Sequence, residues 1–330
     1  MRRPFVTKRI KRLVGEVGAE LKVEPRYKFV GHITFPNGVR TFFRDTSFNI
    51  NGQGSVQIAK DKGYTSFFLK DFGFEVPEWY TVFNEELNSN LSKTSTVEEG
   101  LKACQKIGFP VILKPNDKSK GEGVFKVYNE VEYRKSATEI LRSNYVLLIQ
   151  EFCVGNDYRI VVLDDEIIAA YQRIPLRVTG DGNLSILDLL VKKQSEFHSM
   201  GRETIIPLND ERIKQTLSKQ NLELNSILPK NETVQLLDIS NLSTGGTAVD
   251  VSDTIHEEFK NLALSIADRM CLRFCGVDIL TEDITSPAND YKVIEVNSSP
   301  GLDNYGFLGK QQDKKVDDLY LSILRKLEKV

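Results

Sequence analysis

Alternating apolar and polar positions near the N-terminus predict a β-hairpin. Residues 26–35 and 39–43 are strand-like, and they flank Pro36, Asn37 and Gly38. Asn and Gly tolerate the positive φ angles of tight hairpin turns, so this sequence is typical of the connection. The basic residues before it predict a solvated helix (Arg2, Arg3, Lys8, Arg9, Lys11 and Arg12). Residues 1–55 are short for an independent domain, so we expect them to dock on the rest of the chain.

Helical and strand-like patterns alternate irregularly after this segment. Thr96 and Glu99 have capping-box spacing and predict a helix that ends at Gly108. Other helical patterns cover residues 55–73, 130–142 and 254–274, whereas residues 84–93 are polar and predict a loop. Strand-like runs cover residues 109–113, 124–128, 145–149, 158–163, 167–173, 276–280 and 292–296. This irregular order predicts an α+β fold with separate lobes.

Composition limits the class of protein. The 330 residues are 40% hydrophobic and 27% charged, which is typical of a globular chain with two or three lobes. The net charge of −2 gives no sign of a nucleic-acid partner. Because no apolar run is long enough for a signal peptide or a membrane span, we expect a cytoplasmic protein without a membrane partner.

The four cysteines are too few and too widely spaced for a disulfide scaffold. Cys271 and Cys275 lie four residues apart in a helical pattern, so a zinc pair there is one alternative. No histidine or second cysteine pair lies nearby in the sequence. Buried thiols in a reducing cytosol are the preferred interpretation for all four (Cys104, Cys153, Cys271 and Cys275).

A lysine followed by a glycine-containing loop gives the first candidate site. Lys114 follows a strand-like run, and Gly121 and Gly123 precede the next one. Glycine lets backbone amides approach phosphate oxygens, and Lys114 would add positive charge. The alternative is an ordinary turn. The Walker A string does not occur in the sequence. The dinucleotide-binding glycine pattern does not fit either, since Lys126 stands where its third glycine would be needed.

Oxygen-bearing side chains on two neighbouring strand patterns give the second candidate site. Glu295 and Asn297 are two residues apart and face the same way, and Asp278 lies on the preceding strand. If those strands pair, three oxygen ligands converge, as Mg²⁺ or Mn²⁺ requires. The alternative is a set of solvent-facing strand residues.

Arg159, Arg173 and residues 241–246 form a third set. Arginine offers a planar fork to carboxylate or phosphate, and glycines beside Ser and Thr hydroxyls can bind an anion. Each arginine taken alone could instead be a surface salt-bridge partner.

Several strings together resemble the ATP-grasp superfamily, most closely its cyanophycin-synthetase and bifunctional glutathione-synthetase branch. The resemblance runs from about Ile58 to Gly306. The strings are IAKDKGYTSFFLKDFGFEVPE, GFPVILKPNDKSKGEGV, QEFCVGNDYRIVV, RIPLRVTGDGNLSI, NLSTGGTAVDVSD, GVDIL and VIEVNSSPGLDNY.

The resemblance implies a role for each matching residue. It implies two α+β lobes that grip ATP: residues 56–153 with a glycine-loop lid, and residues 154–330 with the metal and substrate site. ATP would be bound by Lys62, Lys114, Ser119, Gly121, Gly123, Gln150, Glu151, Phe152, Cys153 and Asp157. Asp278, Glu295 and Asn297 would hold Mg²⁺ or Mn²⁺, and Arg159 and Arg173 would be catalytic. Substrate would be bound by Asn241, Ser243, Thr244, Gly245, Gly246 and Ser299.

Two departures from the family pattern affect what can be transferred. Gln150 stands where these relatives usually carry Glu. Because Gln still offers an acceptor for the adenine amine, ATP binding is expected and nucleotide selectivity is left open. The large relatives add a Mur-ligase-like half or a glutamate–cysteine ligase half. We expect a stand-alone ligase or a fragment-like relative here, whose substrates cannot be taken from those enzymes.

The activity implied is ATP-dependent amide formation between a carboxylate and an amine, through an acyl phosphate. Amino acids or short peptides are the expected substrates, and a homo-oligomer is among the expectations because relatives often assemble. A small-molecule kinase and a non-catalytic ATP-binding module are the alternatives. The three histidines lie in unrelated segments, so no catalytic triad is expected, and His256 is expected to pack or cap a helix.

Overall fold

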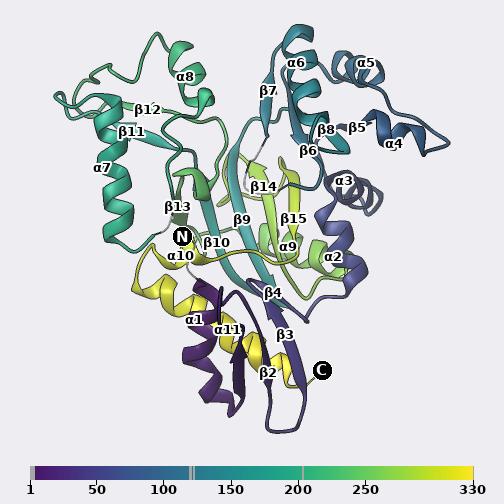
Figure 1. The fold of residues 1–330 in the computed structure, drawn as a ribbon, viewed down its shortest axis with the longest axis vertical. Coiled ribbons are helices and arrows are strands. Elements are labelled where there is room, and N and C mark those ends of the chain that lie inside the picture. Colours follow the sequence, from purple (N-terminus) through teal and green to yellow (C-terminus); the bar gives the residue numbers. More distant parts are fainter. Residues whose placement is uncertain (1–3, 119–120, 122, 203, 330) are drawn as a thin grey trace. The chain divides into compact units, whose positions relative to one another are not determined.

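The computed structural model describes residues 4–118, 121, 123–202 and 204–329 (Figure 1). Their contacts divide the chain into two compact units. Unit 1 consists of Met1–Ile50, Ile168–Asp253 and Ser299–Val330, and unit 2 consists of Asn51–Ile167 and Thr254–Ser298. The predicted boundaries at residues 55 and 153 follow family lobes rather than compactness, so they stay a prediction.

An antiparallel four-stranded sheet opens unit 1. Its strands lie in the order β1 (Glu20–Val23), β2 (Val30–Thr34), β3 (Arg40–Arg44) and β4 (Ser47–Phe48). The predicted hairpin is confirmed as β2 paired with β3, and Gly38 has a φ of +86° in the connecting turn. The sequence analysis missed β1 and began its first strand too early. In Figure 1, α1 (Phe5–Leu13) and α11 (Lys310–Leu327) lie beside this sheet.

The basic N-terminal helix exists, but the expectation that its charges are solvated is wrong for Arg9. The Arg9 side chain is buried and forms ion pairs with Asp313 and Asp317 of α11. Helix α1 buries Ile10 and Leu13 as well. The first and last helices of the described chain are therefore joined by both charge and apolar packing.

The rest of unit 1 packs around short strand pairs. β10 (Glu166–Ile174) pairs with β13 (Thr247–Asp250), and β11 (Arg177–Thr179) pairs with β12 (Thr233–Gln235). The helices are α7 (Ile186–Ser199), α8 (Glu211–Ser218), the 3₁₀ turn η2 (Leu242–Thr244) and α10 (Asp303–Gly306). Buried Leu176, Leu190 and Leu236 belong to the core shared by α7, α8, β11 and β12.

Unit 2 contains a second antiparallel sheet of four strands. Their order is β5 (Trp79–Phe83), β8 (Val146–Glu151), β6 (Val111–Pro115) and β7 (Phe125–Val127). Helices α5 (Val97–Ile107) and α6 (Glu130–Leu141) pack against it through Leu101, Tyr133 and Ala137 (Figure 1). The capping box of Thr96 and Glu99 is confirmed, with both reciprocal hydrogen bonds present.

Three further strands of unit 2 lie side by side in the order β9 (Asn156–Leu163), β14 (Phe274–Thr281) and β15 (Lys292–Asn297). Helix α9 (Glu257–Arg269) packs against β9 and β14. The unit also contains the helices α2 (Gln53–Lys60), α3 (Lys62–Asp71) and α4 (Glu85–Ser89). The paired strands β14 and β15 confirm the pairing on which the oxygen-ligand hypothesis depends.

Three helix predictions need correction. Residues 55–73 form two helices, because Asp61 leaves the helical conformation and caps α3 by accepting from the backbone N–H of Tyr64. The helix expected over residues 254–274 begins only after His256. His256 was expected either to pack in the core or to cap a helix, and it caps α9 by accepting from the backbone N–H of Glu258. The loop expected over residues 84–93 contains α4.

The cysteines also depart in part from expectation. Cys104 and Cys275 are buried, whereas Cys153 is half-buried and Cys271 is exposed. Cys271 has a φ of +52° after α9 and Cys275 lies on β14, so the two do not share a helix face. None of the helices in the described part of the chain is both long and apolar enough to cross a membrane.

Candidate active site

A row of charged side chains crosses the three strands β9, β14 and β15. In the strand register, Asp278 on β14 lies opposite Arg159 on one side and opposite Glu295 on the other. Asn297 follows on β15, opposite Gly276. Figure 1 shows these strands adjacent within unit 2. The structure thus brings together the three predicted metal ligands and one of the two predicted catalytic arginines.

Asp278 is the most deeply buried member of this row, at 1% exposure. Arg159 donates to both of its carboxylate oxygens, from Nε to Oδ1 at 2.6 Å and from Nη2 to Oδ2 at 2.6 Å. Asn297 adds a longer hydrogen bond from Nδ2 to Oδ2 at 3.4 Å. A buried carboxylate requires such compensation, because moving an isolated charge out of water is very unfavourable.

Lys62 extends the charged row from the start of α3. The residue is 8% exposed, and Nζ donates to the backbone carbonyl oxygens of Lys118 at 2.6 Å and Asn116 at 3.4 Å. The same nitrogen lies 3.6 Å from Oε1 of Glu295. Lys62 therefore links the carboxylate on β15 to the segment that follows β6.

Lys114 on β6 and Gln150 on β8 form a second polar pair in unit 2. Lys114 Nζ donates to Gln150 Oε1 at 2.8 Å. Because an ammonium group only donates, this bond fixes the orientation of the amide. Gln150 is 2% exposed, and its Nε2 has no hydrogen-bond partner among the described residues. A buried donor without a partner is costly, and it points to a ligand atom that would accept from it.

The charge of Lys114 is easily lost. Burial lowers the pKa of Lys114 to about 8, the Glu295 carboxylate opposes this shift, and the Lys62 ammonium adds to it. The carboxylates of Asp278 and Asp157 also favour the charged form. The pKa of Lys114 thus depends on three members of the charged row and on Asp157, the residue predicted to bind ribose.

The segment predicted to contact adenine, residues 150–153, begins at the end of β8 and continues beyond it. Glu151 accepts a hydrogen bond from the backbone N–H of Glu78 at 3.0 Å, and the Phe152 ring lies 3.4 Å from the Lys126 ammonium on β7. Burial raises the pKa of Cys153 to about 11, so this thiol is not activated. These residues hold the segment in place, and their contact with adenine stays a prediction.

Two glycines of the predicted phosphate loop have positive φ angles, and phosphate binding by this loop stays a prediction. Gly121 and Gly123 have φ angles of +69° and +67°. A Cβ at Gly123 would come within 3.0 Å of the Pro115 ring, so the position combines an unusual φ with a close approach. Ser119, also predicted for this loop, lies outside the described residues.

Residues 241–246 form a compact loop in unit 1. Asn241 Oδ1 accepts from the Ser243 backbone N–H at 3.0 Å and from its hydroxyl at 2.9 Å. The Thr244 hydroxyl donates to the Asn241 carbonyl oxygen at 3.1 Å, and Gly245 turns the chain with a φ of +105°. The Asn241 side chain and both hydroxyls therefore shape the loop, and substrate binding by this loop stays a prediction.

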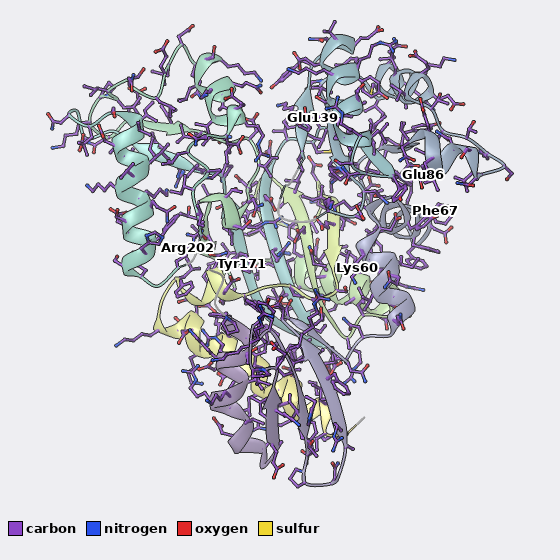
Figure 2. The ribbon with its side chains drawn as sticks, in the orientation of Figure 1. Lys60, Phe67, Glu86, Glu139, Tyr171 and Arg202 are labelled. Carbon is purple, nitrogen blue, oxygen red and sulfur yellow. The ribbon has the colours of Figure 1, made fainter. Side chains whose placement is uncertain are left out.

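Arg202 holds the 241–246 loop and was missed by the sequence analysis. Its Nη2 donates to the carbonyl oxygens of Leu242 at 2.6 Å and Gly246 at 2.7 Å, and its Nε donates to Thr204 Oγ1 at 2.9 Å. Burial lowers the pKa of Arg202 to about 10. Figure 2 labels this side chain just past α7. No local pattern could reveal a contact between segments so far apart in sequence.

The remaining predicted residues lie elsewhere in unit 1. Arg173 is on β10, opposite Ala248 of β13. The Ser299 carbonyl oxygen accepts from the Thr46 hydroxyl at 2.9 Å, which ties Ser299 to the N-terminal sheet. Arg159 and Arg173 belong to different units, so their joint role stays a prediction.

The donor chemistry of Asp278, Glu295 and Asn297 suits a hard divalent cation. All three carry an oxygen atom that can bind such a cation, and Arg159 and Asn297 hold the Asp278 carboxylate in place. No group of three His, Cys, Asp or Glu side chains that could hold a metal occurs within residues 4–118, 121, 123–202 and 204–329. Any metal held here would therefore depend on the Asn297 amide in addition to the two carboxylates.

Two protein-family models match the chain. The RimK-like ATP-grasp domain matches residues 238–318, and the D-ala D-ala ligase C-terminus matches residues 68–224. This chain is an ATP-grasp protein. The predicted family and mixed α+β fold are thus confirmed.

Sequence comparison with known proteins gives relatives from the same family. The ATP-grasp chain is 31% identical over 266 residues to the cyanophycin synthetase of Crocosphaera subtropica, covering 78% of this chain and 29% of the relative. It is 30% identical over 258 residues to the Pasteurella multocida glutathione biosynthesis bifunctional protein GshAB, covering 74% and 32% respectively. The chain therefore spans about three tenths of the length of these relatives.

Solved structures confirm the fold. A bifunctional glutathione synthetase from Pasteurella multocida superposes with a TM-score of 0.62 at 23% identity, covering 97% of this chain and 43% of that one. A D-alanine–D-alanine ligase from Bacillus anthracis superposes with a TM-score of 0.50 at 15% identity, covering 84% and 72%.

Proposed function

We propose that this ATP-grasp protein is an ATP-dependent carboxylate–amine ligase acting on an amino acid or a short peptide. The relatives named above are synthetases and ligases, which supports the reaction class. The observation that carries the proposal is the charged row of Arg159, Asp278, Glu295 and Lys62, with the Lys114–Gln150 pair in the same unit.

ATP would be held by residues of unit 2. Gln150 Oε1 already accepts from Lys114, so Gln150 would not act through that oxygen on the adenine amine as expected from the sequence. Its buried Nε2 would instead donate to an acceptor nitrogen of adenine. Asp157 on β9 would bind the ribose hydroxyls. Lys62 and Lys114 would neutralise phosphate oxygens, assisted by backbone amides of the loop that contains Gly121.

Asp278, Glu295 and Asn297 would hold Mg²⁺ or Mn²⁺, which when bound would supply positive charge to the phosphates. Arg159 fixes the Asp278 carboxylate by its two hydrogen bonds, and Lys62 balances Glu295. The residues that would orient the ligands are therefore part of the same charged row.

The reaction would join two half-steps. A carboxylate oxygen of the substrate attacks the γ-phosphorus, the bond to the β,γ-bridging oxygen breaks, and ADP leaves. The amine nitrogen then attacks the acyl carbon of the acyl phosphate, phosphate leaves, and the nitrogen loses a proton to give the amide. Arg159 and Arg173 would stabilise the developing negative charge, and the 241–246 loop with Ser299 would position substrate.

Trapping of the acyl phosphate tests the proposal. With a panel of amino acids and short peptides, Mg²⁺–ATP and hydroxylamine, the protein should form a hydroxamate, ADP and phosphate in equal amounts. Glu295→Gln should lower the rate by about 10²–10³, as loss of one preorganised charge-stabilising group does elsewhere. The matched control Glu139→Gln removes an exposed carboxylate on α6 of the same unit (Figure 2) and should retain the full rate.

Two results would contradict the proposal. ADP formed together with a stable phosphorylated alcohol, and no hydroxamate with any acid, would indicate a kinase. Equal rates for Glu295→Gln and Glu139→Gln would remove the charged row from the reaction. Assembly into a homo-oligomer stays a prediction.

A further inference from the structure

Unit 1 contains a cavity of about 570 Å³ that none of the predicted ATP or metal residues lines. It lies among α7, β11, β13 and the segment around α10. Its volume falls in the range typical of small-molecule sites, about 300–1,000 Å³. Leu189, Phe197 and Phe307 contribute apolar surface. The cavity can therefore accept a ligand that is partly apolar.

Four cationic side chains line the same cavity, together with one carboxylate. The cations are Arg177, Lys192, Lys193 and Arg202, and the carboxylate is Glu196. Charged groups of one sign are seldom gathered on a concave apolar surface, because each loses water and repels the others. Such an excess of positive charge favours an anionic ligand.

The pKa of Lys193 reflects the neighbouring cations. This pKa is lowered first by burial and then by the Arg202 and Arg177 guanidinium groups, while Glu196 opposes the shift. Lys193 Nζ donates to the backbone carbonyl oxygen of Arg177 at 2.9 Å. An ammonium group has three N–H donors, so this bond leaves capacity for a ligand oxygen.

The single carboxylate restricts the kind of anion. Glu196 would repel a compact, multiply charged group such as phosphate, but it would attract an ammonium group. A peptide with two or more carboxylates and a free amino group matches both signs of charge. An apolar residue between the acidic ones would match the surface formed by Leu189, Phe197 and Phe307.

We propose that this cavity binds a short acidic peptide with a free amino terminus, its carboxylates against Arg177, Lys192 and Lys193 and its ammonium group against Glu196. Arg202 connects the cavity with the 241–246 loop, since it lines the former and bonds to carbonyl oxygens of the latter. Leu242 of that loop also lines the cavity, so the proposal names the kind of peptide that the ligase would bind and rests on the proposed function. Binding measured without ATP separates failure of the peptide site from failure of the ligation reaction.

Calorimetric titration of the full chain without nucleotide tests the peptide site. The probe is the tripeptide glutamyl-leucyl-glutamate, and the comparison is glutaminyl-leucyl-glutamine amide, which has the same shape without carboxylates. The neutral peptide should bind at least about tenfold more weakly, since each charge contact in a partly buried site is worth that much or more. Added salt should weaken only the acidic peptide.

Variants locate the binding to this cavity. Lys193→Met should weaken the acidic tripeptide at least about tenfold. The control Lys230→Met removes an exposed lysine of unit 1 outside the cavity lining and should leave the affinity unchanged. N-acetylation of the tripeptide should weaken binding to the wild type, and Glu196→Gln should abolish that difference. Thermal melting checks that each variant is folded.

Four results would overturn the proposal. They are absent binding of the tripeptide, equal binding of the neutral peptide, and equal affinities for the Lys193→Met and Lys230→Met proteins. The fourth is inorganic phosphate that binds more tightly than the peptide and displaces it, which would make the cavity a simple anion site.

Discussion

Removal of Arg159 should destabilise unit 2 through the buried carboxylate that it would leave behind. In Arg159→Gln the two 2.6 Å hydrogen bonds to Asp278 are lost, and the Asp278 carboxylate, which is 1% exposed, loses the Arg159 cation. Breaking one side of a buried ion pair costs about 3–5 kcal/mol. Because Arg159 itself is 15% exposed, we expect the lower end, about 3 kcal/mol.

The chain offers a matched control at the other end of the same two strands. Arg273 donates to both carboxylate oxygens of Asp164 at 2.7 and 3.2 Å, but the arginine is 44% and the aspartate 22% exposed. Exposed pairs of this kind contribute about 0–1 kcal/mol. Arg273→Gln should therefore cost at most about 1 kcal/mol, and burial is the main difference between the two pairs.

Thermal melting followed by circular dichroism gives the readout. For domains of this size class, about 1 kcal/mol corresponds to about 2–4 °C, so Arg159→Gln should lower Tm by about 6–12 °C. The double variant Arg159→Gln, Asp278→Asn should recover much of that loss, because no unpaired charge remains. Similar Tm values for Arg159→Gln and Arg273→Gln would refute the reasoning. So would a double variant less stable than the single one.

Three other predictions concern packing, charge and loop order. In Gly100→Ala the new Cβ would overlap Tyr133 Oη and Val82, which should cost about 1–3 kcal/mol in thermal melting. In Gly54→Ala nothing lies within 4 Å, so helix propensity should give a small gain. The pKa of Lys114 is about 8, so its ammonium is lost as pH rises through that value. Affinity for an ATP analogue should fall over the same range, and Lys114→Arg should flatten that profile in a binding titration. Arg202→Gln should speed amide hydrogen exchange in residues 241–246, measured by mass spectrometry, by about ten- to a hundredfold; unchanged exchange would contradict the clamp.

Local patterns in the sequence were sufficient for part of the site. The two-residue spacing of Glu295 and Asn297 determines that they share a strand face, and the strand patterns around them predicted β14 and β15. The Thr96 capping box located the start of α5. Each of these features depends on neighbours within a few residues, where spacing and conformation are directly related.

Features that depend on strand register or tertiary packing were beyond such reasoning. The position of Arg159 opposite Asp278 joins residues 119 apart in sequence, and a shift of one residue would separate them. Arg9 was expected to be solvated, but it is buried because its ion-pair partners, Asp313 and Asp317, lie on the distant helix α11. Arg202 had no motif, since its role is to donate to backbone carbonyl groups of a distant loop.

The ion pairs between α1 and α11 have a consequence for how the protein is made. Synthesis proceeds from the N-terminus, so α1 leaves the ribosome long before Asp313 and Asp317 exist. All residues of unit 2 are also translated before α11. During translation, therefore, Arg9 is exposed to solvent or forms other contacts until its native partners are made, whereas unit 2 can already fold. Unit 1, which contains both α1 and α11, is therefore completed after unit 2.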